Sequence, residues 1–316
     1  MAPMQGRESA NVLFVFFSST LYMQRWAQRL LSFQQLAASP CRFSTRSTTR
    51  QLAQAFIDDI TRMKREIAHK DAGVRLVAFR ITTPDGIHDD VGIRQYVASV
   101  KRMTKSIGGI TFEVRDIAPE QVEDAVSQAN GDDSVHAILV LRPGHHAKHA
   151  RSLIAAPKDV EKDEIAASAV THICEQHNAI RGRTLTVIND SSTLGRPLAR
   201  LLVERHAASV FTVDVEAGAV FEHSQDGVSR RSTSSFRDAC SSSSTIVVAP
   251  SDANFTIPPD WVKPGSVVVN VSPHGDAALD RVDQDRVAVV DHVGAVTVAI
   301  LLRNAFHLAR AASKSK

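Results

Sequence analysis

The segment RTLTVINDSSTLGRPLARLL, residues 183–202, carries the strongest structural signal in the chain. Its β-branched run from Thr184 to Ile188 predicts a short, buried parallel strand. A small polar turn follows at residues 189–192, and Gly195 then begins an apolar-periodic helix. Pro197 stands in the first turn of that helix, where its missing N–H is tolerated. Together these elements predict a nucleotide-binding corner, because free N–H groups and the helix dipole favour a bound phosphate.

The glycine pattern of this corner is incomplete. Gly195 is the only glycine between the strand and the helix. Asn189 and Asp190 stand where a close phosphate approach favours glycine or a cation. From the residues alone, a working dinucleotide site and an ordinary α/β core turn are equally good interpretations. Asp190 likewise either repels the 2′-phosphate of NADP or is a turn residue that bonds its own backbone.

The length and composition of the chain limit how many domains it can form and which classes of function it can have. The chain has 316 residues, enough for two domains with substantial cores. A formal net charge of +3 gives no broad basic footprint for nucleic acid. Cys41, Cys174 and Cys240 are widely spaced, which indicates a reducing compartment rather than a disulfide framework. The apolar run at residues 12–17 is far too short to span a membrane.

Residues 1–51 have a different composition from the rest of the chain. They contain no lysine and one acid, Glu8, whereas serine and threonine are dense from Ser32 to Thr49. Their arginines are Arg7, Arg25, Arg29, Arg42, Arg46 and Arg50. This composition is typical of a mitochondrial transit segment and predicts a location in the mitochondrial matrix. The alternative interpretation is a disordered N-terminal arm.

Upstream of the corner, strand and helix patterns alternate. Apolar runs predict strands at residues 74–81, 110–114 and 135–141, and helical spacing predicts helices at residues 52–68, 93–107, 119–129 and 146–155. This alternation predicts a parallel sheet with helices on its faces. His145, His146 and His149 include a pair at helical spacing, but no third metal ligand is near in sequence, so we predict a solvated helix start and no metal site.

The second half repeats the pattern. Strands are predicted at residues 184–188, 209–213, 245–249, 266–271 and 286–290, and helices at residues 164–176 and 296–312. The polar region from residue 216 to 244 is predicted as a loop with one short helix. The fold class that follows is α/β with two domains, the second containing a Rossmann-like parallel sheet.

Several segments, in this order, resemble the bifunctional methylenetetrahydrofolate dehydrogenase/cyclohydrolase family of one-carbon metabolism. They are Gln95–Ser99, Ala137–Pro143, Pro157–Val160, Thr186–Pro197, Trp261–Val271 and Val293–Leu302. The resemblance covers nearly all of residues 52–312 and implies a folate-type catalytic domain at residues 52–160. It also implies an NAD(P)-binding domain at residues 161–296 and a C-terminal helix, residues 297–316, that packs back on the first domain.

The resemblance also assigns the catalytic positions. Tyr96 falls on the family's folate-site helix, and Glu161 falls where the family has the aspartate that holds the pterin. The family's catalytic lysine falls at Val100 and the glutamine that tunes it falls at Leu141. Lys101 is the next residue, but one helical step turns a side chain by about 100°. Lys101 is therefore expected to point away from the site.

For the cofactor, the resemblance implies NAD or NADP at Asn189, Asp190, Ser191 and Gly195. Asn189 replaces the family's first glycine, and Asp190 replaces the arginine that reads the phosphate. Asp214 ends the next strand, where an acid accepts a hydrogen bond from the ribose 2′-OH. The alternative for Asp214 is a solvated strand end. If a dinucleotide binds, these charges favour NAD over NADP.

Three functions stay open. The first is a degenerate, non-catalytic member that serves in a mitochondrial assembly such as a ribosome or a respiratory complex, with no cofactor. The second is an NAD-dependent dehydrogenase of methylene-tetrahydrofolate, and the third is a module that senses folate or nucleotide. Cyclohydrolase activity is not expected, because valine at position 100 cannot transfer a proton. Hydride transfer needs mainly cofactor and folate held face to face, and a homodimer is expected by analogy.

Overall fold

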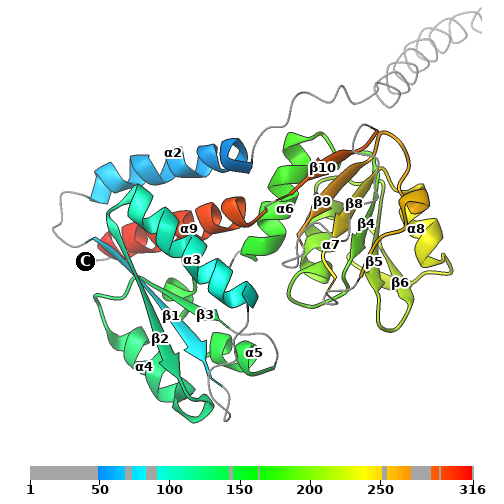
Figure 1. Cartoon of the computed structure of the whole chain (residues 1–316). Helices are drawn as coiled ribbons and strands as arrows, with labels where there is room; N and C mark the ends of the chain where they lie inside the picture. Colours follow the sequence, from blue (N-terminus) through cyan, green and yellow to red (C-terminus); the bar gives the residue numbers. More distant parts are fainter. Residues whose placement is uncertain are drawn as a thin grey trace, which may run out of the picture. The chain divides into compact units, whose positions relative to one another are not determined.

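The computed structural model contains two sheets flanked by helices (Figure 1). It describes residues 49–67, 73–82, 91–141, 145–162, 164–250, 255–271, 286–291 and 293–314. Apart from its last three residues, which lie in the first described helix, the predicted transit segment is outside the described residues. None of the described helices is long and apolar enough to cross a membrane.

The first sheet is small and parallel. Its strands are β1 (Val74–Ile81), β2 (Ile110–Ile117) and β3 (Ala137–Leu141), in the order β2-β1-β3. Side chains on both faces of β1 are buried, since Leu76 and Phe79 point to opposite sides and are each at most 1% exposed. A strand that is buried on both faces has a nearly continuous run of apolar residues. This pattern is why the sequence predicted β1 correctly.

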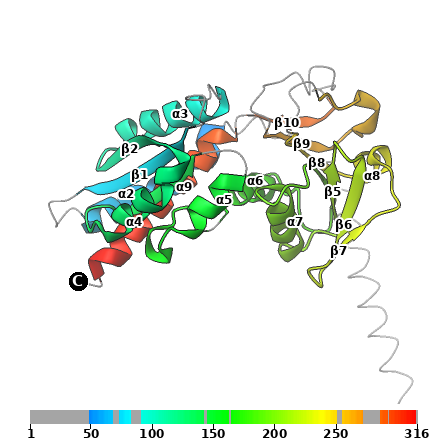
Figure 2. The same ribbon diagram turned by 90° about the horizontal axis from the view of Figure 1, so that it is seen from below.

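Helices cover both faces of this sheet (Figure 2). They are α3 (Val91–Ile107), α4 (Val122–Gly131), α5 (His145–Ser152) and the C-terminal helix α9 (Gly294–Lys314), and α2 (Thr49–Ile67) packs against α9. A 3₁₀ turn at Pro119–Gln121 precedes α4, so the helix begins three residues after the predicted proline start. The helix α3 contacts β2 and α5 contacts β3.

The second sheet has the strand order β10-β9-β8-β4-β5-β6-β7. The strands are β4 (Thr184–Ile188), β5 (Ser209–Asp214), β6 (Ala219–His223), β7 (Ser229–Arg231), β8 (Thr245–Val248), β9 (Val267–Asn270) and β10 (Ala288–Val290). The five strands from β10 to β5 pair in parallel. After β4 the chain continues to β5, which pairs with one edge of β4, whereas β8 pairs with the opposite edge of β4. The carboxyl ends of β4 and β8 therefore form the topological switch point, where open α/β sheets bind ligands.

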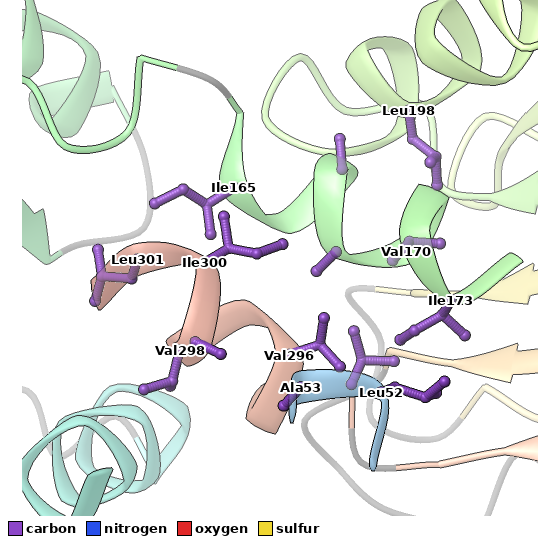
Figure 3. Close-up of a cluster of buried hydrophobic side chains, with 14 of the residues drawn as sticks. Leu52, Ala53, Ile165, Val170, Ile173, Leu198, Val296, Val298, Ile300 and Leu301 are labelled. Carbon is purple, nitrogen blue, oxygen red and sulfur yellow. The ribbon is translucent and has the colours of Figure 1, made fainter. Parts of the chain in front are cut away.

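The helices of the second half are α6 (Ile165–Gln176), α7 (Gly195–Glu204), α8 (Phe236–Ser242) and α9 (Gly294–Lys314). The helix α9 contacts α2, α3 and α6, as well as β1 and β3. Figure 3 shows buried side chains of these helices in one apolar cluster, with Leu52, Ile165, Val296 and Ile300 among them. The cluster joins side chains that lie more than 250 residues apart in the sequence, from Leu52 to Ala309.

One prediction about the fold is wrong. The region at residues 216–244 contains the hairpin β6–β7 and the helix α8, not a loop with only a short helix. All three residues of β7 are polar and exposed, so the strand has no alternating pattern. The signal that was overlooked is the pair Asp226-Gly227, which is typical of a hairpin turn. Gly227 indeed has a positive φ of 77° there.

Candidate functional site

Tyr96 and Glu161 lie close enough to interact electrostatically. Tyr96 comes from α3, and Glu161 follows the 3₁₀ turn Ala156–Lys158 after the first sheet. Burial, and then the negative charge of Glu161, raise the pKa of the Tyr96 hydroxyl well above its usual range. Burial also raises the pKa of the Glu161 carboxyl to about 6, with Arg151 opposing the shift. At neutral pH the pair is therefore a protonated phenol beside a carboxylate.

The two positions that the resemblance assigns to the family's lysine and glutamine, Val100 and Leu141, carry no proton-transfer group. The side chains of Val100 and Leu141 lie in the apolar core and are 0% and 6% exposed. Lys101 is exposed, whereas Val100 points inward from the same helix. One helical step turns a side chain by about 100°, so Val100 can face the core while Lys101 faces solvent. A general base supplied by Lys101 at this site would require the helix to rotate.

Glu161 makes stability depend on pH. A raised carboxyl pKa means that the folded chain binds more protons than the unfolded chain between pH 4.5 and about 6, so stability falls as pH rises through this window. The shift corresponds to about 2 kcal/mol. We expect Glu161→Gln to match the parent protein near pH 4.5 and to exceed it by about that amount above pH 7. Urea unfolding at several pH values measures this difference.

The matched control for this series is Glu120→Gln, at an exposed position. It removes a carboxyl at the surface, away from the buried position of Glu161, and so controls for the loss of one acidic group. Parallel curves for the parent and Glu161→Gln across the whole range would contradict the assigned burial of Glu161.

The corner between β4 and α7 is built around a close approach of two backbone segments. A Cβ atom on Gly195 would lie 2.1 Å from the carbonyl oxygen of Asn189. Only glycine fits such a position. Backbone N–H groups of the turn find their acceptors within the turn itself. Ser191 N–H donates to Asn189 Oδ1 at 2.8 Å, and Leu194 N–H donates to Ser191 Oγ at 3.1 Å. Arg196 N–H donates to the Ser191 carbonyl at 3.0 Å.

Asn189 also spans the switch point. Its Nδ2 donates to the carbonyl oxygen of Ala249 at 2.8 Å. Asn189 follows β4 directly and Ala249 follows β8 directly, so this bond joins the carboxyl ends of the two strands. Ligands enter an open α/β sheet at this crevice. The asparagine side chain thus occupies part of the approach that a glycine would leave free.

Asp190 is held inside a polar network. Its side chain is 4% exposed and accepts from Arg196 Nη2 at 2.7 Å and from Thr212 Oγ1 at 2.6 Å. Because the Thr212 hydroxyl donates to Asp190, it accepts from His223 Nε2 at 2.8 Å. Burial lowers the pKa of His223, although Asp190 opposes this shift. The sequence left Asp190 open as a turn residue or a repelling charge; in the structure its carboxylate forms an ion pair with Arg196.

Asp214 and Arg196 complete the rim of the corner. Asp214 Oδ1 accepts from the Ala217 N–H at 3.0 Å, which caps the turn after β5. Its charge also raises the pKa of Arg196, after the larger effect of Asp190. Arg196 is 60% exposed, so it presents the accessible charge at this corner. The structure thus brings Asn189, Asp190, Gly195 and Asp214 together, with Ser191 in the turn.

Sequence reasoning did not single out Arg196, Thr212 or His223. The position of Arg196 in the first turn of α7, six residues after Asp190, was the available signal for the ion pair. His223 belongs to the strand that was predicted as a loop, so its contact with β5 was not predictable. Among the described residues, no group of three acidic, histidine or cysteine side chains is arranged to hold a metal.

The fold and the corner define a class: an α/β protein with a Rossmann-like sheet whose switch point is of the dinucleotide-binding type. Residues 165–313 match the model of the family described as "Tetrahydrofolate dehydrogenase/cyclohydrolase, NAD(P)-binding domain". This match makes the chain similar to the methylenetetrahydrofolate dehydrogenase/cyclohydrolase family. This confirms the resemblance and the fold class.

Individual relatives show the extent of the similarity. The bifunctional protein FolD of Thermotoga maritima is 28% identical over 255 residues, covering 72% of this chain and 87% of that protein. The methylenetetrahydrofolate dehydrogenase [NAD(+)] of Saccharomyces cerevisiae is 26% identical over 296 residues, covering 78% and 90%. The solved structure of an NAD-dependent 5,10-methylenetetrahydrofolate dehydrogenase from Saccharomyces cerevisiae superposes with a TM-score of 0.70 at 23% identity, covering 85% and 98%. At that identity the superposition supports the fold alone.

Proposed function

We propose that this protein is an NAD-dependent methylenetetrahydrofolate dehydrogenase that lacks cyclohydrolase activity. The observation that carries the proposal is the full burial of Val100 in the apolar core; the resemblance assigns this position to the family's catalytic lysine. Cyclohydrolase chemistry needs a group that moves a proton at the one-carbon bridge. Hydride transfer makes a smaller demand on the protein, because the cofactor supplies the chemistry and the protein orients the reactants.

Tyr96 and Glu161 support binding of a folate-type ligand. The carboxylate of Glu161 accepts hydrogen bonds only, which suits the N–H donors on the edge of a pterin ring. The ring of Tyr96 offers an apolar face for stacking. The Tyr96 hydroxyl stays protonated at neutral pH, since burial and Glu161 raise its pKa. The pair would therefore hold and orient the ligand, and hydride would pass directly to the cofactor.

The choice of NAD rests on Asp214 and on the named relatives. An acid at the end of the second Rossmann strand accepts from a ribose 2′-OH and repels a 2′-phosphate. Asp214 ends β5 at this place. Relatives from Saccharomyces cerevisiae, Dictyostelium discoideum and Schizosaccharomyces pombe carry the name methylenetetrahydrofolate dehydrogenase [NAD(+)]. Arg196, the exposed cation nearby, already pairs with Asp190.

A second candidate is a pseudoenzyme that serves as a subunit of a mitochondrial assembly, such as a ribosome or a respiratory complex. The hydrogen bond from Asn189 to Ala249 favours it, because this bond closes part of the crevice that a dinucleotide would enter. The turn donors are also satisfied internally, so a phosphate would have to displace existing bonds. The arginine-rich, acid-poor composition of residues 1–51 is typical of a mitochondrial transit segment, so a mitochondrial matrix location is proposed for both candidate functions.

Calorimetric titration of the full chain with NAD and with NADP separates the two candidates. The titration is run with and without a non-reacting tetrahydrofolate analogue, beside an Asn189→Gly variant that opens the crevice. We expect micromolar binding of NAD, strengthened by the analogue, with weaker binding of NADP. Asn189→Gly should bind NAD more tightly than the parent, because the Ala249 contact is removed.

Two outcomes would decide against the dehydrogenase. If the well-folded parent binds neither dinucleotide while Asn189→Gly does, the pseudoenzyme becomes the better description. If NAD binds but no hydride reaches it from methylene-tetrahydrofolate in a spectrophotometric assay, the site is a sensor rather than an enzyme. Hydrolysis of methenyl-tetrahydrofolate by the parent would contradict the loss of cyclohydrolase activity.

A further inference from the structure

A hollow of about 290 Å³ lies between residues 303–308 of α9 and residues 159–162, which follow the 3₁₀ turn Ala156–Lys158. Its lining residues are Asp159, Val160, Lys162, Arg303, Asn304, His307 and Leu308. Neither Tyr96 nor Glu161 lines it, so it is separate from the proposed folate-binding pair. Asn304 Nδ2 donates to the Val160 carbonyl at 3.2 Å and thereby fixes the segment to the helix.

Arg303 is an incompletely satisfied cation in this hollow. Its guanidinium carbon lies 5.1 Å from the centre of the Phe56 ring, so the side chain is held by a cation–π contact. The Nε atom is buried and has no hydrogen-bond partner among the described residues. A buried donor without an acceptor costs free energy.

The acidic side chains around the hollow already have partners. Asp159 Oδ1 accepts from the Glu161 N–H at 3.0 Å, and Asp159 Oδ2 lies 3.5 Å from Arg151 Nε. On the rim, His307 lies 3.8 Å from Asp59. The two cations that line the hollow, Lys162 and Arg303, have no ion pair with an acidic residue in the described part of the chain.

We propose that this hollow binds a small oxyanion, a carboxylate or phosphate group on a short stem. The planar guanidinium of Arg303 offers two parallel N–H donors, which match such a group, and Lys162 adds a second charge. Val160 and Leu308 provide apolar surface for the stem. The volume lies just below the usual range for drug-sized ligands, so the ligand has few heavy atoms. The site goes beyond the proposed enzymatic function and is independent of it.

Calorimetry of the full chain at constant ionic strength tests the proposal with two probes, inorganic phosphate and malonate, in the absence of NAD and folate. We expect at least one probe to bind where chloride does not. Lys162→Gln should weaken that binding about tenfold, the effect of one charge-assisted hydrogen bond. Lys101→Gln is the matched control, since Lys101 is also exposed and does not line the hollow. Its affinity should equal that of the parent.

Arg303→Met keeps an unbranched side chain over Phe56 and removes the charge, and we expect it to abolish binding. Lys162 is exposed, so its variant tests the site even if Arg303→Met fails to fold. Preference for phosphate or malonate identifies which oxyanion the site takes. The proposal is overturned if neither probe binds more than chloride, or if Lys162→Gln and Lys101→Gln bind equally. Because NAD and folate are absent, this result is independent of the dehydrogenase test.

Discussion

Gly195→Ala is expected to destabilise the protein by about 3 kcal/mol, the upper end of the usual cost of overpacking, and to abolish dinucleotide binding. The added Cβ would lie 2.1 Å from the Asn189 carbonyl oxygen and 2.6 Å from its carbonyl carbon. Both are backbone atoms, so no change of rotamer can relieve the contact. The turn must move away from α7, which disturbs the donors of Ser191 and Leu194. Chemical denaturation and calorimetry measure the two effects.

Gly131→Ala is the matched control for this prediction. Gly131 ends α4, and a Cβ there would meet nothing within 4 Å. Alanine favours helix over glycine, so a change of less than about 1 kcal/mol is expected. Equal stability of the two variants would show that the corner is looser than its geometry indicates.

Val100→Lys is expected to destabilise the protein at pH 7 by about 3 kcal/mol or more, because it puts a cation into the apolar core. Burial lowers a lysine pKa, so the folded variant would bind fewer protons than the unfolded one below the usual lysine pKa. Stability should therefore recover as pH rises from 7 toward 10. Urea unfolding at several pH values measures this recovery.

Val100→Met separates charge from size, and Lys101→Met tests the exposed neighbour. The first should cost about 1–2 kcal/mol, as is usual for added volume in a packed core, and the second should be close to neutral. If Val100→Lys were as stable as Val100→Met at pH 7, the ammonium group would have reached water or Glu161. Contact with Glu161 would place position 100 at the site, and a regained cyclohydrolase activity would distinguish it from exposure to water.

The sequence predicted the fold well where burial produces a continuous or periodic pattern. The strand Val74–Ile81 was predicted to the residue because both of its faces are covered. The helix that begins at Gly195 was predicted because glycine and proline mark its start. The exposed strand Ser229–Arg231 was missed because it owes its conformation to pairing with β6, and its side chains contribute no burial.

The site was less predictable, for a different physical reason. Asn189 was identified as a departure from a glycine, but its partner is the Ala249 carbonyl, 60 residues later. Nothing in a linear pattern specifies a bond between a side chain and a distant backbone oxygen. Arg196 and Arg303 likewise depend on tertiary neighbours, Asp190 and Phe56. The positions of Tyr96, Val100 and Leu141 came from the resemblance, and their roles stay predictions.

The position of α9 has a consequence for synthesis of the protein. Its buried residues pack against Leu52 and Ala53 of α2, and Arg310 pairs with Glu66 at 3.2 Å. A chain leaving the ribosome would therefore have the strands of its first sheet long before the helix that covers them. We expect the apolar face of that sheet to stay accessible to chaperones until residue 314 has emerged, because contacts between distant residues form late.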